Sequence, residues 1–181
     1  MTKVINTKNG VLRFDKKTVT KEISKDKESW SKDLYDLYQL FSAQHSYTTK
    51  LISRTNDRIY VMERLDIVAD LYDILNDPGP HKLATLENCL KIVLFYNKLY
   101  VDCLEFSIKH LPQGKYFFHI DPSYRNVVFT SDGSIKLIDF NSFKIENNFL
   151  NAEHKGFSQY VLHKTLVLSE RIRLKRKYGK K

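Results

Sequence analysis

Short apolar runs separated by polar turns fill the first third of the chain. Apolar and polar positions alternate through residues 3–23, and the Asn-Gly pair at 9–10 between two such runs is typical of a β-hairpin. Residues 28–43 place bulky apolar side chains at helical spacing, whereas residues 49–53 and 58–63 return to a β-prone pattern. This order predicts a small antiparallel sheet with one helix inserted in it.

Helical periodicity dominates the middle of the chain. Residues 68–75 predict a short helix, and the Pro-Gly-Pro sequence at 78–80 ends it and is the best candidate for a connector. A long helix follows from the N-cap Thr85 to about residue 111, and its two apolar stripes predict burial on several sides. The first stripe comprises Leu86, Leu90, Val93, Val101, Leu104 and Ile108, and the second comprises Phe95, Leu99 and Phe106.

A second β-hairpin is expected in the last third of the chain. Residues 126–129 and 135–138 flank a polar Ser-Asp-Gly turn, and residues 116–118 read as a further short strand. Residues 155–175 are helical in pattern and grade into a basic tail. Strands that gather at the start and helices that follow predict the α+β class.

The composition is that of a globular chain whose charge is spread unevenly. Hydrophobic residues make up 42% and charged residues 28% of the 181 positions, which excludes a collagen-like or fully disordered chain. The formal net charge is +9, but eight basic residues and one acid lie between Lys164 and Lys181. We expect the tail Arg171–Lys181 to be solvated, to bind an acidic partner such as nucleic acid or an acidic protein, or to lie on a membrane surface.

Neither export nor membrane insertion is predicted. The first residues lack an apolar leader, and the most apolar stretch, residues 86–108, contains five charges, which argues against a membrane span. Cys89 and Cys103 are too few for a disulfide framework and lack the spacing of a zinc site. We therefore expect reduced thiols in a cytoplasmic protein.

The residues that carry chemistry are concentrated in two segments, His119–Asn126 and Asp139-Phe140. Asp121 lies in a loop before the predicted hairpin, Asn126 opens the hairpin and Asp139 closes it. Because a hairpin brings its two ends together, Asn126 and Asp139 should be neighbours. Their oxygens suit Mg²⁺, and Asp121 would stand near that metal, well placed to accept a proton from an attacking hydroxyl.

The pattern His-x-Asp-x4-Asn followed by Asp-Phe resembles the catalytic loop and metal-binding motif of protein kinases, and aminoglycoside and choline kinases share a similar pattern. The resemblance implies a two-lobed fold and the cofactors ATP and Mg²⁺. It assigns residues 1–65 to an antiparallel β N-lobe with one helix and residues 66–150 to a truncated, mainly helical C-lobe with the catalytic hairpin. Residues 151–181 would form a C-terminal helix and the basic tail.

The resemblance also implies roles for residues of both lobes. Lys21 resembles the strand lysine that touches the ATP phosphates, and Asp33 stands where the kinase helix usually has the glutamate that positions this lysine. Met62, Glu63 and Leu65 lie in a segment similar to the strand and hinge that contact adenine. In the second lobe, the metal ligands would be Asn126, which also lies at the nucleotide, and Asp139, while Asp121 would be the catalytic base.

Several residues depart from the kinase pattern. A glycine-rich phosphate loop is missing, because Gly10 is the only glycine before Gly79. Asp33 is shorter than the usual glutamate, and Asn141 replaces the glycine that completes the metal-binding motif. The sequence contains no Ala-Pro-Glu segment and is short beyond this motif. The abbreviated layout resembles the short protein kinases of tailed bacteriophages, which would place the protein in the host cytoplasm.

We expect Mg²⁺-dependent transfer of the γ-phosphoryl group of ATP to a Ser or Thr hydroxyl of a protein substrate. Two alternatives stay open. A pseudokinase or interaction module fits the missing glycine-rich loop, although such a scaffold has no need of Asp121, Asn126 and Asp139 together. A small-molecule kinase of the aminoglycoside or choline type fits the lack of an Ala-Pro-Glu segment and Ser123, where protein kinases often carry a lysine.

Overall fold

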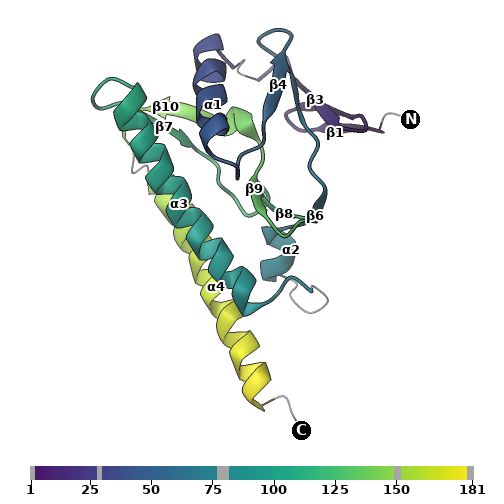
Figure 1. The fold of residues 1–181 in the computed structure, drawn as a ribbon, viewed down its shortest axis with the longest axis vertical. Helices are drawn as coiled ribbons and strands as arrows, with labels where there is room; N and C mark the ends of the chain where they lie inside the picture. Colours follow the sequence, from purple (N-terminus) through teal and green to yellow (C-terminus); the bar gives the residue numbers. More distant parts are fainter. Residues whose placement is uncertain (1–2, 28–29, 77–81, 149–151, 179–181) are drawn as a thin grey trace.

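The computed structural model describes residues 3–27, 30–76, 82–148 and 152–178, and it shows a β-rich first lobe above a mainly helical second lobe (Figure 1). The first lobe holds a five-stranded antiparallel sheet in the order β1-β2-β3-β5-β4. Its elements are β1 (Lys3–Thr7), β2 (Gly10–Phe14), β3 (Thr18–Ile23), α1 (Lys32–Gln44), β4 (Leu51–Arg54) and β5 (Ile59–Glu63). This is the predicted sheet with one inserted helix.

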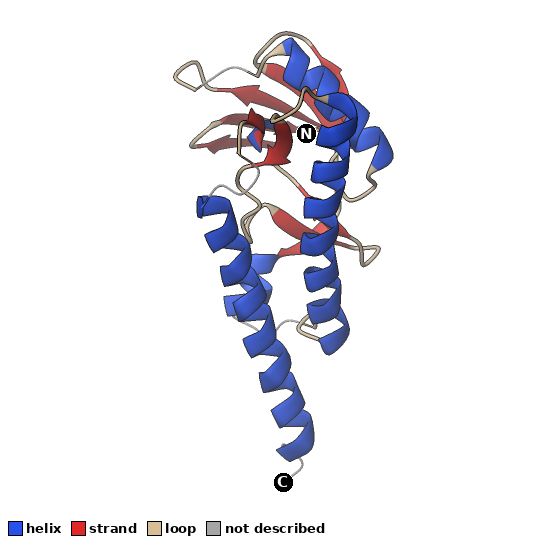
Figure 2. Ribbon diagram, turned by 90° about the vertical axis from the view of Figure 1, so that its left-hand side faces the viewer, coloured by secondary structure: helices blue, strands red, loops and turns tan. Residues whose placement is uncertain are grey.

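The second lobe combines helices with two small sheets, in the strand orders β6-β8-β9 and β10-β7. Its helices are α2 (Leu71–Asn76), α3 (Leu86–His110) and α4 (Ala152–Tyr178), with the short 3-10 helix η1 (Phe140–Ser142). Its strands are β6 (Ile67–Asp70), β7 (Tyr116–His119), β8 (Val127–Thr130), β9 (Ile135–Leu137) and β10 (Phe143–Glu146). The predicted hairpin is therefore the pair β8–β9, and Figure 2 shows these strands between the main sheet and the helices.

The turn between β1 and β2 requires a glycine. Gly10 has a φ of +143°, and a Cβ atom at this position would lie 1.9 Å from the carbonyl oxygen of Glu22 on β3. Thr7 Oγ1 donates a hydrogen bond to the carbonyl oxygen of Gly10, at 2.9 Å, and accepts one from the backbone N–H of Asn9. The predicted Asn-Gly turn is thus formed and tied down by its own side chains.

The predicted helix at 68–75 is only half right. Its first part is strand β6, which pairs antiparallel with β8, and the helix α2 begins at Leu71. Val68 is exposed, and the backbone of β6 gains hydrogen bonds from the edge of β8, so tertiary pairing outweighs the local helical pattern. The Pro-Gly-Pro connector and residues 28–29 of the first predicted helix lie outside the described residues.

One of the two apolar stripes predicted for α3 faces the core. Phe95, Leu99 and Phe106 are buried, but Leu90 and Ile108 of the other stripe are 58% and 74% exposed. The expectation of burial on several sides is therefore wrong. The helix packs on one side only, where α4 lies beside it and β7 crosses it (Figure 1).

An aromatic cluster joins the two lobes behind the predicted metal-binding motif. Trp30 precedes α1 and packs its ring against Tyr38, Tyr60 and Phe140, at centroid distances of 5.6, 5.9 and 5.1 Å. All four rings are buried. Such offset and edge-to-face contacts stabilise a core beyond the area they bury. Because Phe140 is held in this cluster, the backbone that carries its neighbours is held as well.

Hydrogen bonds to β9 also join the lobes. The backbone N–H of Leu137 donates to the carbonyl oxygen of Tyr47 at 2.7 Å, and Leu137 O accepts from both the N–H and the hydroxyl of Thr49. The Tyr47 hydroxyl donates to Asp102 of α3 at 3.0 Å, and His45 Nδ1 lies 3.0 Å from the same carboxylate. The segment between α1 and β4 is therefore fixed to both β9 and α3.

The last helix is longer than its predicted span of 155–175, and it ends in a basic turn of Lys175, Arg176 and Lys177. Within the described ranges, no helix has both the length and the apolar character that a membrane crossing needs. Cys89 and Cys103 are buried and free.

Candidate active site

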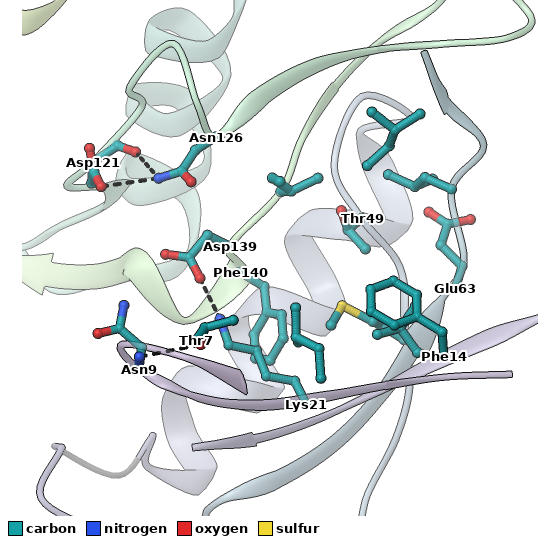
Figure 3. A pocket seen from close by; sticks show the side chains of 16 residues that line it. Thr7, Asn9, Phe14, Lys21, Thr49, Glu63, Asp121, Asn126, Asp139 and Phe140 are labelled. Carbon is teal, nitrogen blue, oxygen red and sulfur yellow. Dashed lines mark hydrogen bonds and ion pairs between the residues drawn. The ribbon is translucent and has the colours of Figure 1, made fainter. Parts of the chain in front are cut away.

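A cavity of about 320 Å³ lies between the five-stranded sheet and the β8–β9 hairpin (Figure 3). It is lined by Thr7, Asn9, Leu12, Phe14, Val19, Lys21, Thr49, Met62, Glu63, Leu65, Ile67, Asp121, Asn126, Ile138, Asp139 and Phe140. The view shows Phe14 and Glu63 at one end and Asp121, Asn126 and Asp139 at the other. The cavity therefore has an end rich in apolar side chains and an end rich in carboxylates and amides.

Lys21 reaches into the polar end from β3. Its side chain is buried, and Nζ donates hydrogen bonds to the carboxylate of Asp139 and to the amide oxygen of Asn141. The ammonium group also lies 5.3 Å from the ring centre of Phe140, a cation–π contact. Three consecutive residues of the second lobe thus surround one lysine of the first lobe.

Asp139 adopts a left-handed backbone conformation, with φ at 63°, and it is the only described non-glycine residue with positive φ. Such a conformation costs energy for an L-residue and turns the chain sharply from β9 into η1. Burial by itself would raise the pKa of the Asp139 carboxyl. The charge of Lys21 and hydrogen bonds from Lys21 and Ser142 outweigh burial and hold this pKa below its usual value, so Asp139 is ionised.

His119 connects the two halves of the motif. Its ring is fully buried, and Nε2 lies 3.3 and 3.2 Å from the carbonyl oxygens of Ile138 and Asp139. Nδ1 accepts a hydrogen bond from the backbone N–H of Asp121 at 3.2 Å. Burial lowers the pKa of His119 to about 4, so the neutral ring donates at Nε2 and accepts at Nδ1. The histidine thereby links the backbone of Asp121 to the segment of Ile138 and Asp139.

Asp121 and Asn126 are paired at the mouth of the cavity. Asn126 Nδ2 donates to the backbone carbonyl of Asp121 at 2.9 Å and to its carboxylate oxygen Oδ2 at 3.0 Å. Both amide hydrogens of Asn126 are used in this way, which leaves its side-chain oxygen for another ligand. Asp121 is exposed to solvent, so its carboxylate is accessible to an incoming molecule.

The structure does not bring Asp33 to Lys21. Asp33 is exposed in the first turn of α1, and the hydrogen-bonding partners recorded for Lys21 are Asp139 and Asn141. The buried residues of α1 are Tyr38, Phe41 and Ser42, none of them acidic. The expected lysine–aspartate pair is therefore absent among the described residues, because the inward face of α1 is used for aromatic packing.

Met62, Glu63 and Leu65 all line the cavity. The Glu63 carboxylate accepts a hydrogen bond from the backbone N–H of Lys50 at 2.8 Å, and its own N–H donates to Lys50 O. Glu63 is thus held on one side by Lys50, the residue before β4. Met62 pairs across the sheet with Val19, which pairs with Phe14, so these three residues belong to one wall of the cavity.

Four residues at the polar end were not among the sequence candidates. Thr7 and Asn9 line the cavity from the β1–β2 turn, where kinases place their glycine-rich loop. Asn141 and Ser142 hydrogen-bond to Lys21 and Asp139. The sequence could have indicated Thr7 and Asn9, because they lie in the turn of the predicted β1–β2 hairpin, and such a turn folds over the neighbouring strands. The role of Asn141 depends on a tertiary contact with a residue far away in the sequence and left no local signal.

Comparison with known proteins gives a match in structure alone. No family model and no curated protein matches the sequence. The chain is similar to a choline/ethanolamine kinase family protein from Mesorhizobium loti, with a TM-score of 0.50 and 9% sequence identity. The alignment covers 100% of this chain and 82% of that chain. The fold is the two-lobed α+β fold of protein-kinase-like proteins, with an antiparallel β lobe and a truncated helical lobe, as the sequence predicted.

Proposed function

We propose that the chain is an ATP- and Mg²⁺-dependent phosphotransferase that acts on a hydroxyl group. One observation carries the proposal: Lys21, Asp139 and the Asp121–Asn126 pair meet at one end of a cavity whose other end is apolar. A nucleotide has the same division, with a flat, weakly polar base at one end and charged phosphates at the other. The similarity in fold to a protein of the choline/ethanolamine kinase family supports the proposal.

The adenine ring would lie between Phe14 and Val19 on one side and Ile138 on the other, near Met62–Leu65. Among the described residues, the backbone N–H of Leu65 donates no hydrogen bond to another backbone group, so it is available to the base. The phosphates would extend towards Lys21 beneath the turn of Thr7 and Asn9. Backbone N–H groups of a tight turn can contact phosphate without the flexibility of a glycine-rich loop.

The donor set at the polar end fits Mg²⁺. Asp139 offers an ionised carboxylate and Asn126 an uncommitted amide oxygen, and such a pair leaves room for water and phosphate oxygens, which this ion prefers. These two residues would hold the metal. When bound, Mg²⁺ neutralises charge on the phosphate oxygens.

Asp121 is the proposed general base. It is exposed at the cavity mouth and oriented by Asn126 and by the His119 contact to its backbone. Its carboxylate would accept the proton of the acceptor hydroxyl as the new oxygen–phosphorus bond forms. The bond from the γ-phosphorus to the bridging oxygen breaks in the same displacement, and ADP leaves with that oxygen. Lys21 would stabilise the charge that gathers on the phosphates.

The acceptor is proposed to be a Ser or Thr hydroxyl of a protein. A small alcohol is the second candidate, and the similarity to a protein of the choline/ethanolamine kinase family favours it. A pseudokinase remains the non-catalytic alternative, but the orientation of Asp121 by two separate contacts serves no purpose in a scaffold that only binds.

The test is transfer of label from γ-labelled ATP with Mg²⁺, first to proteins of a bacterial lysate and then to choline and ethanolamine. Asp121→Asn and Asp139→Asn proteins run in parallel, and Asp36→Asn, an exposed carboxylate on α1, is the matched control. Label that disappears in both site variants and persists in the control supports the proposal. Label on protein bands identifies a protein kinase, whereas label on either alcohol identifies a small-molecule kinase.

Absence of transfer from a folded protein would contradict catalysis. In that case a rise in melting temperature with ATP and Mg²⁺ would indicate a pseudokinase that still binds nucleotide. No rise in melting temperature would contradict the nucleotide site as well.

A further inference from the structure

An exposed apolar stripe on α3 has the spacing of a coiled-coil seam. The α3 seam consists of Leu90, Leu94, Asn97, Val101, Leu104 and Ile108, separated alternately by four and three residues. All six positions are exposed, and the five apolar ones range from 36% to 74% exposure. A 4-3 alternation over almost three heptads keeps one narrow apolar line on a helix and is typical of a helix that pairs with another helix.

The seam lies apart from the contacts that hold α3 in its own fold. The core face of α3 is formed by Ile92, Phe95, Tyr96, Leu99 and Phe106, which are buried against α4, β7 and the aromatic core. The seam is therefore a second apolar face of the same helix. An exposed apolar stripe as long as the α3 seam is more often an interaction site than a chance result of amino-acid composition.

The two flanks of the seam differ in charge. One flank carries Lys91, Lys98 and Glu105, each one residue after a seam position. The other flank, one residue before the seam positions, carries the half-buried side chains of Val93 and Tyr100. Thus Lys91, which also pairs with Glu87 one turn earlier at 2.9 Å, stands near the start of the helix, and Glu105 stands near its end on the same side.

We propose that α3 pairs with α3 of a second copy of this chain, in an antiparallel arrangement with a two-fold axis near Leu99. In this arrangement the charged flank of one copy faces the charged flank of the other. Lys91 of each copy therefore meets Glu105 of the other. The apolar layers match as well, because Leu90 meets Ile108 of the second copy and Leu94 meets its Leu104. A parallel pair would instead place each charged flank against an apolar one.

The central residues are compatible with this arrangement. Lys98 lies near the axis and would approach its own copy, but its charge is offset by Asp102 on the same helix, 3.0 Å away. Asn97 is the one polar residue of the seam and stands next to the axis. In this register it faces Val101 of the second copy, and a single polar residue in such a seam lowers affinity.

Sedimentation equilibrium over a range of concentrations tests the proposal. The wild-type chain should show twice its monomer mass of 21.4 kDa. Leu94→Glu and Val101→Glu should each be monomeric with an unchanged circular dichroism spectrum, because both side chains are exposed in the single chain. Leu166→Glu, on the 61% exposed position of α4, is the matched control and should remain dimeric. A monomeric wild type, or dimers that survive both seam variants, would overturn the proposal.

A charge exchange tests the antiparallel arrangement separately. Lys91→Glu alone should raise the dissociation constant by roughly fivefold to tenfold, because it affects two symmetric ion pairs. The double variant Lys91→Glu with Glu105→Lys should restore the wild-type value. Failure of the double variant to recover would rule out the antiparallel pairing. Neither residue belongs to the proposed active site, so the outcome is independent of whether the chain transfers phosphate.

Discussion

The buried ammonium group of Lys21 donates a hydrogen bond to the side-chain oxygen of Asn141, 120 residues away in the chain. Asn141 occupies the position after Asp139-Phe140, where protein kinases carry glycine. The lysine is therefore anchored from the second lobe by Asn141, which lies two positions after Asp139, the proposed metal ligand. This arrangement removes the need for an acidic partner on α1, whose inward face is aromatic.

Loss of the Asn141 amide should reduce turnover. A hydrogen bond to a buried charge contributes about 1.5–3 kcal/mol, so Asn141→Leu is expected to lower kcat/KM for ATP by roughly 10- to 100-fold. Steady-state phosphotransfer measures the loss, and Asp33→Leu is the comparison. A larger loss for Asp33→Leu than for Asn141→Leu would show that α1 supplies the partner of Lys21 during catalysis.

Replacement of the two site aspartates should separate binding from chemistry. Asp121 is exposed at the mouth of the cavity, so Asp121→Asn is expected to lower kcat by about 10²- to 10⁴-fold while nucleotide binding persists. Asp139→Asn should instead weaken the binding of ATP with Mg²⁺. Melting temperature at increasing nucleotide concentration reports binding, and labelled transfer reports turnover. Equal loss of binding in both variants would contradict the separate roles.

Stability should fall as the pH is lowered towards 4, because His119 is buried in its neutral form. Its pKa of about 4 in the folded chain lies below the ordinary value of 6.5. Between these values the unfolded chain binds more protons, so the free energy of unfolding rises with pH and the full contribution is present above about pH 6.5. The difference amounts to on the order of 3 kcal/mol.

Urea unfolding at pH 7 and at pH 4.5 measures this dependence. His119→Gln should be less dependent on pH over the same window, because an amide does not titrate. Burial also lowers the pKa of His45, so a smaller slope of the same sign should remain. An unchanged slope in His119→Gln would show that another group is responsible.

Gly10→Ala should disturb the β1–β2 turn over the cavity. The added methyl group would lie 1.9 Å from the Glu22 carbonyl oxygen, so β2 and β3 would have to separate. We expect a raised KM for ATP and a loss of stability of more than about 1 kcal/mol. Gly133→Ala is the matched control, because Gly133 also has a positive φ but open space where the methyl group would lie. Equal losses in both proteins would point to backbone strain rather than the clash.

The sequence predicted the parts of the fold that local pattern and local chemistry determine. The Asn-Gly turn, the β8–β9 hairpin and the approach of Asn126 to the Asp139 segment, where the N–H of Ile138 donates to Asn126 O, all involve residues close in sequence. The start of β6 was mistaken for helix because its stabilising partner, β8, lies some sixty residues further along. Local propensity could not reveal that pairing.

The partner of Lys21 and the exposed face of α3 were missed for a related reason. An apolar stripe on a helix predicts that something covers it, but the pattern is the same whether the cover comes from this chain or another. The choice between Asp33 and Asn141 depended on which face of α1 the aromatic cluster occupies. Trp30 and Phe140 decide that choice, and they lie in different lobes.

The hydrogen bonds between Leu137 and the segment of Tyr47–Thr49 bear on which side of the cavity a ligand could enter and leave. They join the rear of the cavity to the strand that leads into Asp139, so separating these walls would break these hydrogen bonds. Exit and entry must then depend on the opposite rim, where the Thr7–Gly10 turn is held mainly by its own hydrogen bonds and by one from Ser24 to Asn9. For the nucleotide proposed above, we therefore expect exchange to be limited by this short hairpin rather than by the hinge between the lobes.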